Sequence, residues 1–289
     1  MFVHGSNLLE KETHKTKYQD PQSVAFLTEI REKYDAWKKA NEDLVGPKAL
    51  ITEDDVATLK ERVRLLNEYK DFVDQQKYAE QFDSRSNLHS SILEEFMYYL
   101  FKDMVTEFST HALIGKSHTF KDLFFRSESY AEMLSAPKVF IERKDHDFAI
   151  GVTIEAKFTV AGSTEETVRP FDLPAVAIEC KTYLDKTMLQ DASTAVEQIK
   201  HRNPDALYIV VAEWLKLSES VNLKKSKIDQ IYVLRKQKNT DREFRYLPGY
   251  VKNPIYDDAV AHLFETVRTF LTTSWEGGVA FGLQKGFLI

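Results

Sequence analysis

The first part of the chain repeats apolar side chains at three- and four-residue steps, which is typical of amphipathic helices. One such segment runs from Pro21 to Leu44 and a second from Thr52 to about Phe82. A Gly-Pro pair breaks the chain between them, and Thr52 with Asp55 three residues later is typical of a helix N-cap. We predict a hairpin of two long helices, which serves either as a dimerisation arm or clamp over a long ligand, or as a helical layer on the main domain.

A third helix is predicted from Asn87 to Phe108, because its apolar positions recur at about 100° per residue. On this helical wheel Glu95 lies at the edge of the apolar stripe, whereas Glu94 lies nearly opposite to it. We therefore expect Glu95 to face a site between this helix and its neighbour, with a solvated carboxylate on the flank of the helix as the alternative. His89 falls on the buried face, where a hydrogen-bonded core histidine is expected.

Period-two alternation, the pattern of a β-strand, begins at Lys138. The segment from Lys138 to Lys144 forms one predicted strand and Asp147 to about Val160 a second. A polar turn joins the second strand to a third that includes Ala175 to Lys181, so these two predict a hairpin. Residues 109–137 and the tail from residue 276 to 289 indicate no clear element.

The second half of the chain alternates helices and apolar strands. An amphipathic helix from Met188 to Arg202 leads into a continuous apolar run, Ala206 to Ala212, which predicts a βαβ crossover with a strand buried on both faces. A further strand is predicted from Ile228 to Leu234 and a last helix from Asp257 to Trp275. Hairpin and crossover together predict an α/β fold with a central mixed β-sheet flanked by helices and a helical hairpin region before it.

We predict two regions, residues 1–85 as a helical N-terminal region and residues 86–289 as the α/β core. The formal net charge of the chain is −6, which argues mildly against a polyanion as a general partner. Counted by segment, residues 1–87 carry 14 Lys and Arg against 17 Asp and Glu, whereas residues 221–252 carry 9 against 3. Contacts to phosphate groups are therefore expected in the basic segment 221–252.

The composition, 43% apolar and 29% charged residues, is that of a soluble globular protein. The start of the chain lacks an apolar stretch of signal-peptide length, and no run of about 18 apolar residues could span a bilayer. We predict a cytoplasmic protein without a membrane partner. The single cysteine, Cys180, rules out an internal disulfide and a thiolate zinc cluster, and its position predicts a small buried side chain.

Candidate chemistry lies on the predicted hairpin, where Asp147, Glu179 and Lys181 share one face of neighbouring strands. Two converging carboxylates form a hard-oxygen site suited to Mg²⁺ or Mn²⁺, and the backbone carbonyl of Cys180 could add a ligand. Lys181 would lie beside a metal-bound water, where it could position that water or help to remove its proton. A plain ion pair between strands is the alternative that spacing alone leaves open, and Asp145 is a rival ligand.

These residues resemble the PD-(D/E)XK nuclease superfamily, above all type II restriction endonucleases. Asp147 is followed, after 31 residues, by a Glu-Cys-Lys run, with a predicted helix before it and a crossover helix after it. The stretches from Ser86 to Phe101 and from Lys144 to Gly151 look like those of the DdeI and BbvCI kind, the latter built of two different subunits. One departure is His146, which stands before Asp147 where the pattern has proline.

The resemblance implies a restriction-endonuclease-like core in which Asp147 and Glu179 bind Mg²⁺, with Mn²⁺ as a substitute. It further implies that Lys181 serves the attacking water and that Glu95 is an auxiliary acid. The expected activity is Mg²⁺-dependent cleavage of double-stranded DNA at a specific sequence, by a homodimer or by one subunit of a heterodimer with a related partner. Two alternatives stay open, a repair, resolution or transposition nuclease of the same fold and a non-catalytic DNA-binding or assembly subunit.

Phosphate contacts are predicted in the basic segment 221–252, because such contacts place a nuclease on its duplex. The candidates are Lys224, Lys225, Lys227, Arg235, Lys236, Lys238, Arg242 and Arg245. A solvated basic loop is the alternative for each of them, and any that reach the major groove could read guanine.

Overall fold

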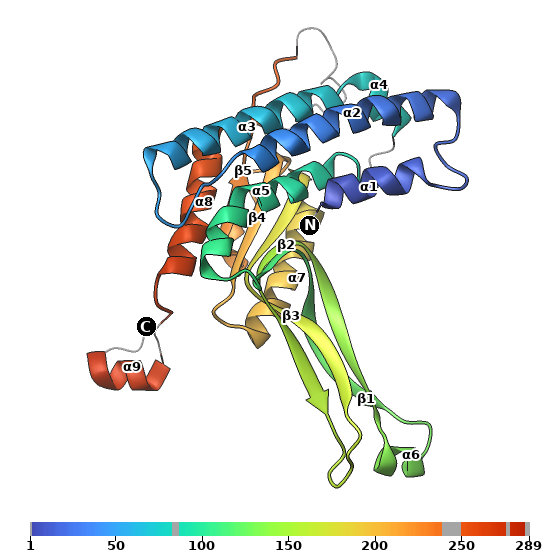
Figure 1. Cartoon of the computed structure of the whole chain (residues 1–289). Coiled ribbons are helices and arrows are strands. Elements are labelled where there is room, and N and C mark those ends of the chain that lie inside the picture. Colours follow the sequence, from blue (N-terminus) through green and yellow to red (C-terminus); the bar gives the residue numbers. More distant parts are fainter. Residues whose placement is uncertain (1, 83–86, 239–249, 276–277, 287–289) are drawn as a thin grey trace.

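A five-stranded mixed sheet runs through the computed structural model, which describes residues 2–82, 87–238, 250–275 and 278–286 (Figure 1). Its strands follow the order of the chain, and antiparallel pairing of the first three gives way to parallel pairing of the last three. The strands are β1 (Leu113–Arg126), β2 (Lys138–Phe158), β3 (Thr167–Leu184), β4 (Leu207–Leu215) and β5 (Gln230–Val233). The predicted α/β class with a mixed sheet is confirmed.

Helix α7 (Lys186–Arg202) makes the crossover from β3 to β4 and thereby keeps these two strands parallel. The Asp185 side chain caps it by accepting a hydrogen bond from the Met188 amide at 2.9 Å. The apolar side of α7 packs on one face of the sheet in a cluster of its own, which includes Val196, Tyr208 and Val210. Helix α7 therefore covers this face of β3 and β4.

The N-terminal helices form the predicted hairpin from α2 (Pro21–Asp43) and α3 (Glu53–Val73), which lie side by side in Figure 1. Thr52 is the N-cap of α3 and makes a complete capping box with Asp55. The second helix ends at Val73 instead of near Phe82, and a short helix α4 (Gln76–Gln81) follows it. Helix α1 (Val3–Glu12) was not predicted, because its sequence is polar with few apolar positions.

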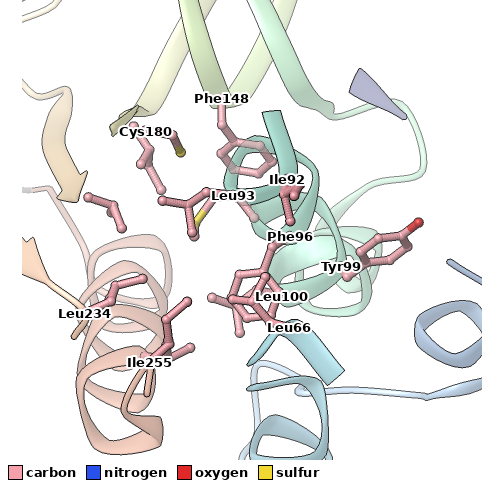
Figure 2. Packing of buried hydrophobic residues seen from close by; sticks show 14 of the residues in the cluster. Leu66, Ile92, Leu93, Phe96, Tyr99, Leu100, Phe148, Cys180, Leu234 and Ile255 are labelled. Atoms are coloured by element: carbon pink, nitrogen blue, oxygen red, sulfur yellow. The ribbon is translucent and has the colours of Figure 1, made fainter. Parts of the chain in front are cut away.

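Helix α5 (Ser90–Phe108) lies between the hairpin and the second face of the sheet. Figure 2 shows Phe96 and Leu100 of α5 between Leu66 of α3 and the sheet residues Phe148 and Cys180. All of these side chains are buried. Burying one Leu or Phe side chain stabilises the fold by about 1.5–3 kcal/mol. Helix α8 (Asp257–Thr272) completes the layer, so the main core joins helices from both ends of the chain.

A long arm formed by β1, β2 and β3 projects from the body and carries the short helix α6 (Tyr130–Ser135) at its end (Figure 1). The two strands predicted before and after Asp145 are one strand, β2, which bends in its middle so that both of its ends run into the arm. The Arg169 guanidinium donates a hydrogen bond of 2.9 Å to the Val139 carbonyl and so ties β3 to the first half of β2. Residues 109–137, left unassigned from sequence, form β1 and α6.

Gly151 permits the close approach that follows this bend. A Cβ at this position would lie 2.2 Å from the carbonyl oxygen of Leu173 on β3, so a side chain would push the two strands apart.

The remaining elements are a 3₁₀ turn, η2 (Leu223–Lys225), and helix α9 (Gly278–Lys285) in the tail. In the part of the chain that the structure describes, no helix combines the length and the apolar character needed to cross a bilayer. The predicted boundary between residues 85 and 86 lies outside the described residues and stays a prediction.

Candidate active site

The site lies where the arm leaves the body, and it is built by the middle of β2 and the end of β3. The Lys181 ammonium donates hydrogen bonds to Asp147 Oδ2 at 2.9 Å and to Glu179 Oε2 at 2.8 Å. The backbone N–H of Cys180 donates a third bond, of 2.8 Å, to the same Asp147 oxygen. The three charged side chains selected from sequence are therefore neighbours, and Cys180 points into the core as predicted.

A β-bulge in β2 gives this site its shape. Gly115 pairs with Ala149 and Ser117 with His146, so a two-residue step on β1 faces a three-residue step on β2. The extra residue interrupts the alternation and bends the strand, as bulges do. Simple alternation places His146 and Asp147 on opposite faces, yet His146 Nδ1 lies 2.9 Å from Glu179 Oε1. The bulge therefore brings both residues to the site.

Charge and burial set the protonation of the trio. Burial raises the pKa of Asp147, and the negative charge of Glu179 adds to this effect. For Glu179 burial acts in the same direction, but the His146 hydrogen bond and the Lys181 charge outweigh it and lower the pKa to about 2. Burial alone would lower the pKa of Lys181, yet Asp147 and Glu179 raise it above the usual value. Lys181 is thus an ammonium ion at neutral pH.

The prediction that Glu95 faces the site is wrong. Its buried carboxylate accepts hydrogen bonds from the backbone amides of His4 and Gly5, at 2.9 and 3.1 Å, and so anchors α1. The hydroxyls of Tyr34 and Tyr99 donate to its other oxygen at 2.9 and 3.0 Å. The helical wheel misled because α1, which has no clear apolar pattern, packs on that side of α5.

Glu94 faces the site in its place. It lines a cavity of about 450 Å³ together with Asp147 and Lys181. Burial, followed by the negative charge of Asp147, raises the pKa of Glu94 to about 8. The carboxyl groups of Glu94 and Asp147 therefore share this cavity, and that of Glu94 is held in its protonated form by its surroundings.

The same cavity is lined by Asn7 of α1, Lys116 of β1 and Tyr183 of β3. The Lys116 side chain is exposed, and within the described ranges it makes no ion pair. It lies opposite the bulge, and its positive charge acts to lower the pKa of Glu94. Sequence reasoning passed over Lys116 because the segment around it showed no strand pattern.

Asp145, the rival ligand, lies outside this group. It is exposed on the arm, where its carboxylate is 2.7 Å from His118 Nδ1. The bulge that follows Asp145 explains why its side chain and that of Asp147 lie in different places, although the two residues are close in sequence.

The prediction that Arg235 contacts DNA is also wrong. Its side chain is fully buried, and its guanidinium pairs with Glu213 at 3.1 Å and donates to the Asn253 carbonyl at 2.7 Å. Lys70 pairs with the same Glu213 carboxylate at 2.8 Å, so Arg235 belongs to a buried ionic cluster beneath α3. Such a charge needs its partners in place and is not free for phosphate.

The other basic candidates lie on the surface or outside the described residues. Lys224, Lys225 and Lys227 are exposed around η2, and Lys236 and Lys238 are exposed after β5, where Lys236 pairs with Asp258. Arg242 and Arg245 lie outside the described residues. DNA contact by these side chains stays a prediction.

The donor set suits a hard divalent cation. Asp147, Glu179 and Glu94 offer carboxylate oxygens, and Mg²⁺ needs only one or two of these, together with water and substrate phosphate. Among the residues that the structure describes, no three acidic, His or Cys side chains already form a ligand cage. The reason is visible in the geometry, since the Lys181 ammonium lies between the two strand carboxylates. The residues present therefore fit a metal that shares this position with Lys181.

Comparison with known proteins agrees with this architecture. The sequence model of a family described as Bpu10I restriction endonuclease matches residues 85–286. No curated protein matches the chain. Among solved structures, one described as the native BbvCI A2B2 tetramer at low resolution is similar, with a TM-score of 0.69 and 21% sequence identity over 96% of this chain and 99% of that chain. This likeness shows the fold, including the N-terminal helices that precede the matched family region.

Proposed function

The chain belongs to the Bpu10I restriction endonuclease family, and from this membership we propose that it is a catalytic subunit of a type II restriction endonuclease. The substrate is double-stranded DNA with a specific sequence, and the reaction is hydrolysis of a phosphodiester bond with Mg²⁺, for which Mn²⁺ substitutes. The observation that carries the proposal is that Asp147 and Lys181 line one cavity with Glu94, while Glu179 binds the same Lys181 ammonium.

In this proposal Asp147 and Glu179 hold the metal, with Glu94 and the Cys180 carbonyl as further oxygen donors. When bound, the metal neutralises charge on the scissile phosphate and makes an attacking water more acidic. The raised pKa of Glu94 supports a cation at this place, because a positive charge in the cavity would favour its ionised form. Asp147, whose pKa is also raised, gains in the same way.

Lys181 serves the reaction as a charged donor. Its raised pKa makes it a poor proton acceptor at neutral pH, so we assign it the task of orienting the attacking water and stabilising negative charge on the phosphate. Lys116, at the edge of the same cavity, is placed to contact a phosphate of the DNA backbone. The exposed lysines around η2 and after β5 are assigned the contacts that position the duplex.

The assembly follows from the number of sites. One such site cuts one strand, so a double-strand break needs two chains that each contribute a site. The similar solved structure is described as an A2B2 tetramer, which supports a second copy or a related subunit as the partner here.

The proposal is tested with purified protein, plasmid DNA and Mg²⁺. The wild type should produce discrete fragments or a nick at a fixed position, and Lys181→Ala should lose at least about a hundredfold in rate, because a charge that stabilises the transition state is gone. Lys60→Ala, an exposed lysine on α3 outside the cavity, is the matched control and should cut normally.

Full cutting by Lys181→Ala would contradict the assigned site. Cutting that follows the shape of the DNA, such as junctions or flaps, would instead indicate a repair or transposition nuclease. Binding of duplex without any cleavage, alone or with a partner, would indicate a non-catalytic subunit.

A further inference from the structure

His146 stands directly before Asp147 in the chain and contacts the other strand carboxylate of the site, Glu179. Resting on the proposed function, we propose that His146 is a positioning residue that fixes the Glu179 carboxylate for a divalent metal ion. It acts through Glu179 and touches neither DNA nor metal itself.

The contacts of Glu179 show what this fixation consists of. His146 Nδ1 lies 2.9 Å from Oε1, and the Lys181 ammonium lies 2.8 Å from Oε2. Each oxygen is thus held by one side chain, Oε1 by His146 of β2 and Oε2 by Lys181 of β3 itself. A carboxylate has about four lone-pair positions, so two remain for a metal while the plane of the group is set.

The hydrogen-bond roles are determined by the partner. Because an ionised carboxylate can only accept, the ring nitrogen that faces Glu179, Nδ1, must carry a proton. The other nitrogen of His146, Nε2, is buried and has no hydrogen-bond partner in the described part of the chain. The bond to Glu179 is therefore the one polar interaction seen for this ring.

The surroundings of the ring hold it in this pose. Tyr208 of β4 meets the imidazole edge-on, with ring centroids 6.0 Å apart, and the β2 bulge points the side chain toward this face of the sheet.

Leaving a buried nitrogen without a partner costs about 1–3 kcal/mol. An apolar ring would avoid this cost, so packing alone does not explain a histidine here.

Loss of the donor should release the carboxylate. The terminal torsion of a glutamate is broad, so without His146 the plane of Glu179 turns more freely and the metal must order it on binding. Residues that orient a metal ligand through a hydrogen bond are typically worth 10–100-fold in metal affinity.

Two variants separate positioning from packing. His146→Phe keeps the ring volume and removes the donor, whereas His146→Asn keeps an N–H donor close to the position of Nδ1. Mn²⁺ binding to the DNA-free protein is measured by electron paramagnetic resonance, with circular dichroism as a check of folding. We expect His146→Phe to bind Mn²⁺ about 10–100-fold more weakly than wild type and His146→Asn to stay within a few-fold of it.

Kinetics give a second readout. The Mg²⁺ concentration for half-maximal cleavage should rise in His146→Phe by the same factor, while the rate at saturating Mg²⁺ changes little. A folded His146→Phe that binds Mn²⁺ as tightly as wild type overturns the proposal, and so does an equal loss in both variants, which would indicate packing.

The tautomer is tested on the wild type and does not depend on how any variant folds. Nitrogen-15 spectra of histidine-labelled, metal-free protein should show His146 protonated at Nδ1, and an Nε2–H tautomer would overturn the inference. If the wild type binds Mn²⁺ but cuts no DNA, the proposed function fails while the Mn²⁺ affinities of the variants still decide the role of His146.

Discussion

Replacing Glu94 by glutamine should stabilise the metal-free protein while abolishing its proposed activity. The carboxyl group has an ordinary pKa of 4.5 and is raised to about 8 in the folded protein by burial and by Asp147. Between these two values the folded protein binds more protons than the unfolded chain. Stability contributed by this group is therefore present at low pH and is lost as the pH rises from about 4.5 to 8.

The size of the effect follows from the same linkage. At pH 7 Glu94 is ionised in the unfolded chain and protonated in the folded protein. The interval from its ordinary pKa of 4.5 up to pH 7 corresponds to roughly 3 kcal/mol of unfolding free energy. Solvent in the open cavity reduces this to about 1–2 kcal/mol. Glutamine has nearly the same size and does not ionise, so Glu94→Gln should gain that amount, or roughly 2–6 °C in melting temperature.

The assay is urea or thermal unfolding in the presence of EDTA, from pH 5 to 8.5. The advantage of Glu94→Gln over wild type should be small at pH 5 and grow toward pH 8. Glu219→Gln, in an exposed loop, is the control and should stay within about 0.5 kcal/mol of wild type at every pH. An advantage that is absent at pH 8, or equal at both ends of the range, would refute the reasoning about Glu94.

Three further predictions concern the buried ionic cluster, the cap of α3 and the binding of Mg²⁺. Arg235→Ala should lose about 3 kcal/mol in urea unfolding, because Glu213 keeps only one of its buried cationic partners; stability like that of wild type would show that the cluster is not needed. Thr52→Ala should lose about 1 kcal/mol in the same assay through its N-cap, and an unchanged midpoint would contradict this. The Mg²⁺ concentration for half-maximal cleavage should fall by up to about tenfold per pH unit from pH 6 to 8, since protons compete for Glu94; a flat profile would rule out Glu94 as a ligand.

The sequence alone predicted that Asp147, Glu179 and Lys181 are neighbours, because these residues lie on strands with strong local patterns. Apolar alternation around Glu179 and Lys181 placed both on one strand face, and the buried run of β4 revealed the crossover. These are short-range signals that burial on both sides of the sheet imposes on the sequence. The same holds for Thr52, whose capping box is contained within four residues.

The parts that sequence reasoning missed depend on contacts between distant segments. The choice between Glu94 and Glu95 is made by α1, whose His4 and Gly5 amides approach α5 from the start of the chain. The contact of His146 with Glu179 depends on a β-bulge, which no residue pattern in the sequence predicts. Arg235 looks like a surface charge until Glu213 and Lys70 are known to surround it. Tertiary context decides each of these cases.

The adjacent carboxylates on α5 limit how this protein can change over evolutionary time. Neighbouring residues of a helix point about 100° apart, so a residue deleted between the start of α5 and Glu94 would move Glu95 to the present position of Glu94, and an inserted residue would move Glu94 to the position of Glu95. The deletion would bring the group that anchors α1 into the cavity, whereas the insertion would bring the acid of the cavity to the amides of α1. The turn at the end of the arm can lengthen at little energetic expense. We therefore expect length variation among relatives to collect at the arm and to spare this first stretch of α5.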